Sequence, residues 1–122
     1  MKKTLITGAT GQIGSELIPA LRKKYGAENV IAAGHTHTPT KDTLESGPYC
    51  QLDVRNVETL HATITEHQVD TIYHLASLLS AEAEHTPQLA WDINMNGLLN
   101  VLETARLHRC AVFFPSSIGA FG

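Results

Sequence analysis

Three glycines recur at every third position near the start of the chain, in the stretch GATGQIG. Gly8, Gly11 and Gly14 follow a short apolar run and precede apolar residues at helical spacing. A strand, a glycine-rich turn and a helix in this order can hold a pyrophosphate, because the N–H groups at the helix start face the anion. The glycines permit a tight turn, a close approach of the backbone to the phosphates, and close packing of helix on strand. The stretch therefore predicts a dinucleotide site, with a tight turn that binds nothing as the alternative.

The residue that is expected to contact the adenosine ribose lies at the end of the second apolar run. Dinucleotide-binding folds place an Asp or Glu there, about 20 residues beyond the glycines, to bind the ribose 2′-hydroxyl. This chain has Gly34, His35 and Thr36 instead, so neither an acid nor an arginine stands at the position. His35 or Thr36 could bind the ribose, and both could equally be ordinary loop residues. We expect NAD as the cofactor, with NADP not excluded, and we expect Gly34→Asp to improve discrimination for NAD.

Polar residues also end the third and fourth apolar runs. Asp53 could accept a hydrogen bond from the adenine amino group, or it could cap the helix that follows. The fourth run ends in His74, Leu75, Ala76 and Ser77. Because the carboxyl ends of parallel strands line the cofactor crevice, we expect these residues where the strand order reverses.

Short apolar runs alternate with helical patterns along the whole chain. Strands are predicted at Thr4–Thr7, Val30–Ala33, Tyr49–Leu52, Thr71–Leu75 and Ala111–Phe114. Helices are predicted from Ile13 to about Tyr25 with a kink at Pro19, after the N-cap Asn56, and after Pro87, with a loop from His35 to Pro48. This alternation predicts an α/β fold, a Rossmann-type doubly wound parallel sheet that is truncated after the fifth strand.

The composition fits one ordinary globular domain over residues 1–122, with 43% hydrophobic and 17% charged residues. The net charge of −3 argues against a nucleic acid or a membrane as partner. We find no signal peptide and no long apolar span, so we expect a cytoplasmic protein. The basic trio Arg22–Lys24 is expected on a solvated helix end, and no metal site is expected at His35 and His37.

Several stretches together resemble the extended short-chain dehydrogenases/reductases of the NAD-dependent epimerase/dehydratase superfamily. They are GATGQIG, the DV of Asp53 and Val54, HLAS at 74–77 and SSIGAFG at 116–122. Two more specific stretches are most similar to the L-threonine 3-dehydrogenases of that superfamily, namely YHLASLLSAEAE at 73–84 and WDINMNGLLNVLE at 91–103. The resemblance covers essentially the whole chain.

The resemblance implies a role for each residue that matches the family pattern. The implied cofactor contacts are Gly8, Gly11, Gln12, Ile13 and Gly14 with the pyrophosphate, Asp53 and Val54 with the adenine, and Leu75, Ala76 and Ser77 with the nicotinamide side. Ser80 would lie beside substrate and nicotinamide, and Ser117 would help to hold the substrate oxygen. Asn94 would support the active site, although packing or local capping explains it nearly as well.

The implied reaction takes hydride from C3 of L-threonine, a small-molecule substrate, onto NAD. Two alternatives stay open. One is a nucleotide-sugar epimerase or dehydratase of the same superfamily, and the other is a non-catalytic dinucleotide-binding module.

Two departures from the family pattern bear on activity. Gly34 stands where NAD-dependent members usually have Asp, and no Lys lies four residues after Tyr25, Tyr49 or Tyr73, so the family's Tyr-x-x-x-Lys is absent. That tyrosine is the general acid and base, and the lysine eases the loss of its proton. In the family the pair follows shortly after the position of Gly122. We therefore expect an N-terminal portion of a longer enzyme, inactive by itself.

The fifth predicted strand would form an exposed edge of the sheet, and it would also expose the side chains of two of its own residues, Phe113 and Phe114. Uncovered apolar edges favour pairing with another chain. We therefore expect a homodimer or a self-associating fragment, through this edge or through the long helix around Leu98 to Ala105.

Overall fold

The computed structural model describes residues 3–10, 12–35, 39–76 and 87–114, apart from the side chains of Gln12 and Ala90. In this part of the chain, five parallel strands form one sheet in the order β3-β2-β1-β4-β5. The strands are β1 Thr4–Thr7, β2 Val30–Gly34, β3 Tyr49–Gln51, β4 Thr71–His74 and β5 Ala111–Phe113. The predicted α/β Rossmann-type sheet is confirmed.

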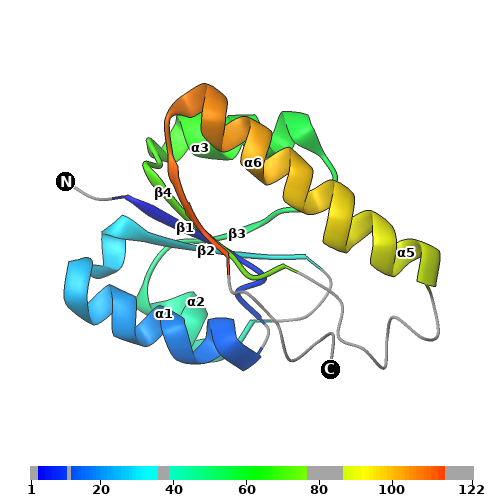
Figure 1. Ribbon diagram of the computed structural model, residues 1–122. Coiled ribbons are helices and arrows are strands. Elements are labelled where there is room, and N and C mark those ends of the chain that lie inside the picture. The colour runs from blue at the N-terminus through cyan, green and yellow to red at the C-terminus, as the bar shows by residue number, and fades with distance from the viewer. Residues whose placement is uncertain (1–2, 11, 36–38, 77–86, 115–122) are drawn as a thin grey trace.

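Helices cover both faces of the sheet, with α1 and α2 on one side and α3, α5 and α6 on the other (Figure 1). The helices are α1 Gln12–Tyr25, α2 Lys41–Ser46, α3 Val57–His67, α5 Pro87–Trp91 and α6 Gly97–His108. A short 3₁₀ helix, Ala27–Asn29, precedes β2, and a π-helical turn, Asp92–Asn96, joins α5 to α6 in one continuous run. None of the helices in the described residues is long and apolar enough to cross a bilayer.

The strand order reverses between β1 and β4. From β1 the chain moves outward through β2 to β3, and it then returns past β1 to form β4 and β5. Thr7, the last residue of β1, pairs with Ala33 on β2 and with His74 on β4. The carboxyl ends of β1 and β4 therefore meet at a topological switch point, where open α/β sheets bind ligands.

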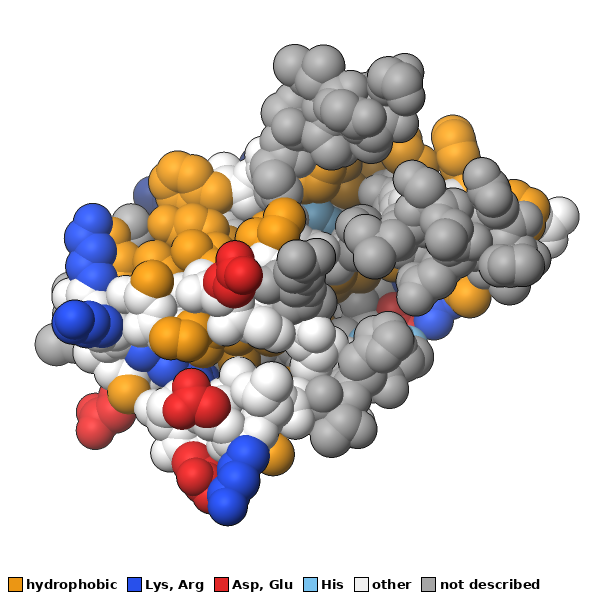
Figure 2. All heavy atoms as spheres, turned by 90° about the horizontal axis from the view of Figure 1, so that it is seen from below, with side chains coloured by type: hydrophobic (Ala, Val, Ile, Leu, Met, Phe, Trp, Pro, Cys, Tyr) orange, Lys and Arg blue, Asp and Glu red, His pale blue; other side chains and the backbone are white. Residues whose placement is uncertain are grey.

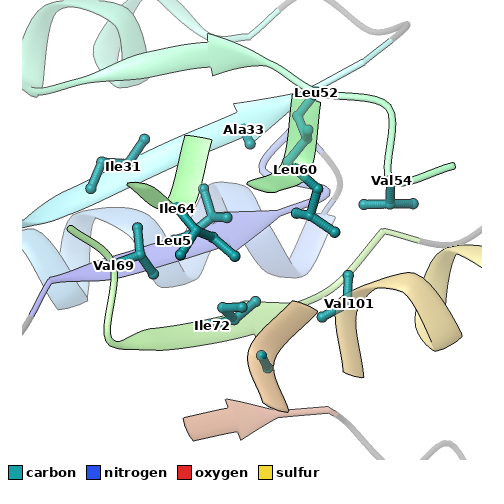
Figure 3. Close-up of a cluster of buried hydrophobic side chains, with 11 residues drawn as sticks. Leu5, Ile31, Ala33, Leu52, Val54, Leu60, Ile64, Val69, Ile72 and Val101 are labelled. Atoms are coloured by element: carbon teal, nitrogen blue, oxygen red, sulfur yellow. The ribbon is translucent and has the colours of Figure 1, made fainter. Parts of the chain in front are cut away.

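The core consists of two apolar clusters, one on each face of the sheet. Alternate residues of β1 point to opposite faces, so Leu5 packs toward α3 and α6 while Ile6 packs toward α1. Figure 3 shows the first cluster, in which strand residues meet Leu60 and Ile64 of α3 and Val101 of α6. Each of these side chains is at most 2% exposed. Both faces of a parallel sheet need such cover, and it holds the switch point in place.

The predicted loop from His35 to Pro48 is wrong in part, because it contains the helix α2. Six mainly polar residues give no apolar period that the sequence could reveal. The helix begins at the N-cap Thr40, whose hydroxyl accepts a hydrogen bond from the N–H of Thr43 at 3.1 Å. The predicted N-cap of α3, Asn56, is confirmed, since its side chain accepts a hydrogen bond from the N–H of Thr59.

The expectation that Arg22 lies on a solvated helix end is also wrong. Only 5% of this residue is exposed. Its guanidinium donates to four acceptors, the carbonyls of Val30, Thr43 and Pro48 and the hydroxyl of Ser46, with the shortest contact to each between 2.6 and 3.2 Å. These partners belong to β2, α2 and the segment before β3. Arg22 is therefore a polar centre that joins α1 to its surroundings, while Lys23 and Lys24 are exposed.

Apolar side chains are exposed beside β5, which is the outermost strand on its side of the described sheet. Phe113 is 48% and Phe114 50% exposed. Together with Ile13, Leu17, Tyr73 and Leu75 they line an open hollow of about 340 Å³. Figure 2 shows hydrophobic side chains gathered on the face of the molecule that carries α1. Self-association through this edge stays a prediction.

Candidate functional site

The turn between β1 and α1 is built from close backbone contacts at the switch point. Gly8 has φ +67°, and a Cβ on it would lie 2.6 Å from the backbone N of Ala76 and from the carbonyl carbon of Leu75. A Cβ on Gly14 would lie 2.7 Å from the carbonyl oxygen of Gly8. Only glycine fits at either position. The chain can therefore turn tightly after β1 while α1 packs directly onto the turn.

Hydrogen bonds hold this turn to the strands on both sides. The N–H of Ala9 donates to the carbonyl of Ala33 at the end of β2, at 2.9 Å. On the other side, the hydroxyl of Thr7 accepts from the N–H groups of Leu75 and Ala76, at 3.1 and 3.2 Å. Thr7 is not among the site residues predicted from the sequence. A buried threonine that ends a strand just before a glycine turn is the signal that could have found it.

The Thr7 hydroxyl also fixes the tautomer of His74. Because this hydroxyl accepts two N–H groups, its own proton points to Nδ1 of His74, 2.8 Å away. His74 is 1% exposed, and burial lowers its pKa from 6.5 to about 4. The imidazole is therefore neutral at pH 7, with its proton on Nε2. Among the described residues this Nε2 has no hydrogen-bond partner.

We predict that His74 makes the stability of the protein depend on pH. Between pH 4 and 6.5 the unfolded chain binds a proton on this histidine and the folded chain does not, so the free energy of unfolding falls as the pH falls. The expected loss is up to about 3 kcal/mol. Denaturant unfolding measured from pH 7 to pH 4 checks the slope. The slope should shrink in His74→Asn and persist in His67→Asn, and an unchanged slope in His74→Asn would contradict the assignment.

A charged cluster lies beyond the end of β3. Arg55 donates from Nε and Nη2 to the two carboxylate oxygens of Asp53, at 2.9 and 2.6 Å, and its Nη1 lies 3.4 Å from Asp92. The side-chain hydrogen bonds from Arg55 hold the pKa of Asp53 below its usual value. His35 Nε2 lies 3.5 Å from the same carboxylate. The alternative that Asp53 caps α3 is wrong, because Asn56 is the cap; adenine recognition by Asp53 stays a prediction.

The start of α6, which directly follows the turn that contains Asn94, packs on the loop after β3. The side-chain amide of Asn100 donates to the carbonyls of Val54 and Arg55, at 3.0 and 3.3 Å. A Cβ on Gly97 would lie 2.5 Å from Cγ2 of Val54, so the backbone of α6 at Gly97 packs directly on the Val54 side chain. Val54 itself is buried in the core, and Asn94 lies in the π-helical turn. Arg55, Asp92 and Asn100 are not among the site residues predicted from the sequence, where they are visible only as polar residues near Asp53 and Gly97.

The predicted site residues are only partly brought together by the described structure. Gathered at the carboxyl edge of the sheet are Gly8, Gly14, His35, Asp53, Leu75 and Ala76. Ile13, in the first turn of α1, is 59% exposed and faces the apolar hollow. Outside the described residues lie Gly11, Ser77, Ser80, Ser117 and the side chain of Gln12. No group of three potential metal ligands occurs in the described part of the chain.

Comparison with known proteins places this site in a family. Residues 4–122 match the NAD dependent epimerase/dehydratase family. The chain belongs to this family. Over its full length it is 48% identical to an uncharacterized epimerase/dehydratase of Staphylococcus haemolyticus and 46% identical to one of Staphylococcus aureus. The chain spans about 38% of the length of each of these relatives, so it corresponds to their N-terminal portion.

Solved L-threonine dehydrogenases share this part of the fold. The enzyme from Clostridium difficile is 52% identical, with a TM-score of 0.92 over 97% of this chain and 37% of that one. A GalE-like L-threonine dehydrogenase from Cupriavidus necator is 43% identical, with a TM-score of 0.87 over 95% of this chain and 37% of that one. A UDP-glucose 4-epimerase from Stenotrophomonas maltophila, 23% identical with a TM-score of 0.86 over 100% of this chain and 39% of that one, shares the fold alone.

The described residues fit the dinucleotide that the family name implies. Because Gly8 has no side chain, the backbone of the turn is open to a ligand at the switch point. The helix α1 begins at Gln12, just after this turn. The first N–H groups of a helix have no partner within it and carry the positive end of its dipole, which suits a pyrophosphate.

Proposed function

We propose that this chain is the dinucleotide-binding part of an L-threonine 3-dehydrogenase, which transfers hydride from C3 of L-threonine to NAD. The observation that carries the proposal is the rigid turn at Gly8, held against Leu75 and Ala76 at the switch point of the sheet. The choice of substrate is supported by the 52% identity to the Clostridium difficile enzyme, against 23% to a UDP-glucose 4-epimerase.

The residues of this chain would bind and orient the cofactor. NAD, when bound, supplies the acceptor for the hydride. The N–H groups at the start of α1 would bind its pyrophosphate, and the absence of a side chain at Gly8 would let the backbone approach it closely. Thr7 would hold the Leu75–Ala76 backbone in place beneath it. The neutral state of His74 keeps an extra positive charge out of the site at pH 7.

The proton of the substrate hydroxyl needs a separate acceptor. The tyrosines of these 122 residues, Tyr25, Tyr49 and Tyr73, have no lysine four residues further on. We therefore assign the acceptor to a part of the enzyme outside these residues, and we expect the chain by itself to produce no NADH from L-threonine. An absorbance assay of NADH with the purified chain checks this, and turnover above background would contradict it.

A chimera tests the proposed reaction directly. The chain would replace the matching N-terminal segment of the Clostridium difficile L-threonine dehydrogenase, with which it shares 52% identity. We expect the folded chimera to reduce NAD in the presence of L-threonine, because the grafted segment supplies the cofactor site and the host supplies the remainder. The matched control is the same chimera with Gly8→Ala, which should be inactive.

The outcomes of this experiment separate the candidate functions. A chimera that folds, as judged by circular dichroism, and binds NAD but does not oxidise threonine would overturn the substrate assignment. Conversion of UDP-glucose instead would favour the epimerase alternative. A folded chimera that binds neither NAD nor NADP would overturn the dinucleotide site itself.

A further inference from the structure

The end of β2 carries an unusual contact between two neighbouring strands. Gly34, the last residue of β2, is buried, and a Cβ on it would lie 2.6 Å from the hydroxyl oxygen of Tyr49 and 2.9 Å from Cγ2 of Thr10. Tyr49 belongs to β3 and Thr10 to the glycine-rich turn. The phenol oxygen therefore lies in the space that a side chain at position 34 would need.

The sheet register explains how Tyr49 reaches this place. Tyr49 pairs with Ala32, two residues before Gly34. Residues two apart on a strand face the same side, and two residues rise about 6.6 Å, which is close to the length of a tyrosine side chain. The ring therefore runs along β2 on the α1 face, packed against the cluster that contains Ile6 and Ile18. Its hydroxyl ends at the carboxyl edge of the sheet, beside the glycine-rich turn.

The chemistry of this hydroxyl suits a ribose. A phenol donates one hydrogen bond and accepts two, and no described residue occupies the Tyr49 hydroxyl with a hydrogen bond. Burial raises the pKa of Tyr49, so the group is uncharged at physiological pH. The nearest acid along this edge, Asp53, is paired with Arg55. The end of β2 around the Tyr49 hydroxyl therefore carries no unpaired negative charge.

We infer that Tyr49 contacts the adenosine ribose of the cofactor and takes the place of the carboxylate that dinucleotide folds have at the end of β2. The inference deepens the proposed function and rests on the binding of a dinucleotide. A carboxylate accepts from the 2′-hydroxyl and repels a 2′-phosphate, whereas a phenol bonds to either group. The chain therefore binds NAD and NADP with affinities within about fivefold of each other, since the difference of one neutral hydrogen bond is of this size.

This contact changes the expected effect of Gly34→Asp. An aspartate at position 34 alone would collide with the Tyr49 hydroxyl, 2.6 Å from its Cβ, and with Thr10. The single substitution therefore costs affinity for both cofactors instead of sharpening the preference for NAD. With Tyr49→Phe and Thr10→Ser in the same chain, the hydroxyl of Tyr49 and the Cγ2 methyl of Thr10 are both removed, and the carboxylate can enter. We expect this triple variant to bind NADP at least about tenfold more weakly than NAD, because the 2′-phosphate then meets a carboxylate.

The decisive measurement uses ADP and 2′-deoxy-ADP in calorimetric titrations of the chain and its Tyr49→Phe variant. In the wild type, ADP should bind about three- to tenfold more tightly than 2′-deoxy-ADP, as expected for one hydrogen bond. In Tyr49→Phe the two should bind equally, because either deletion removes the same bond. Tyr25→Phe, which removes a hydroxyl at the far end of α1, should keep the wild-type ratio.

The results also separate this inference from the proposed function. A wild type that binds neither ADP nor NAD contradicts the proposed function. A wild type that binds both but has the same ratio of ADP to 2′-deoxy-ADP affinity as Tyr49→Phe overturns the role of Tyr49. A purely structural role of Tyr49 would lower the thermal stability and both affinities together, and it would leave the ratio unchanged.

Discussion

Replacing Arg22 with methionine should lower the free energy of unfolding by about 3–5 kcal/mol, because buried carbonyls lose a charged donor. The guanidinium now donates to the carbonyls of Val30, Thr43 and Pro48 and to Ser46. Methionine fills part of the volume but cannot donate a hydrogen bond. The short helix α2 should detach first, since Thr43 and Ser46 join it to α1. Urea unfolding followed by circular dichroism measures the loss.

Two further variants separate the causes of this effect. Arg22→Lys keeps the positive charge but lacks the planar fork, so it should recover only part of the lost stability. Lys23→Met removes an exposed charge from the adjacent position and should change the stability by less than about 0.5 kcal/mol. Equal stability of Arg22→Met and the wild type would show that the network of hydrogen bonds contributes little.

Gly8→Ala should both destabilise the protein and abolish dinucleotide binding. The φ of +67° costs an alanine about 1–2 kcal/mol, and its Cβ would lie 2.6 Å from backbone atoms of Leu75 and Ala76, which cannot rotate away. Together the strain and the overlap should cost about 3–5 kcal/mol. Because the turn must move away from β4, the start of α1 moves with it. We expect a loss of NAD affinity of at least about 100-fold, measured by calorimetry under conditions where the variant is folded.

Gly26→Ala is the matched control for this prediction. Gly26 also has a positive φ, +95°, but its nearest neighbour to a new Cβ is the flexible side-chain amide of Asn29, at 3.2 Å. It lies between α1 and β2, away from the switch point. Gly26→Ala should therefore show backbone strain without the overlap, about 1–3 kcal/mol because φ +95° with ψ 137° is a conformation that glycine alone adopts readily, and it should retain NAD binding. If Gly8→Ala keeps the NAD affinity that Gly26→Ala keeps, the overlap with Leu75 and Ala76 is not a real constraint.

The sheet could be predicted from the sequence because its signals are local. Each observed strand ends within one residue of its predicted bounds, since buried parallel strands are short apolar runs with turn residues on either side. The glycine turn was equally visible, because the positive φ at Gly8 and the close approach at Gly14 both demand glycine. The helix α1 continues through Pro19, as predicted.

The missed features depend on contacts between distant parts of the chain. Arg22 is an ordinary basic residue at a helix end until β2 and α2 surround it with carbonyl groups. Tyr49 was assigned to a strand, but its proximity to Gly34 follows from the sheet register, which a single sequence does not display. Asp53 was found at the strand end, whereas its pairing with Arg55 depends on the turn between them.

The π-helical turn at Asp92–Asn96 sets the rotational phase of the helical run that contains it. Asp92 and Asn100, eight positions apart, both contact the loop after β3. In a regular α-helix they would lie about 80° apart around the axis, but one residue absorbed by the turn brings them to within about 20°. Deleting a single residue here would convert the turn to a regular α-helix and keep this phase, because seven positions span about 700°, which is about 20° short of two full turns. Inserting a residue would instead rotate Gly97 and Asn100 by about 100° away from their partners. This segment therefore tolerates the loss of one residue far better than the gain of one.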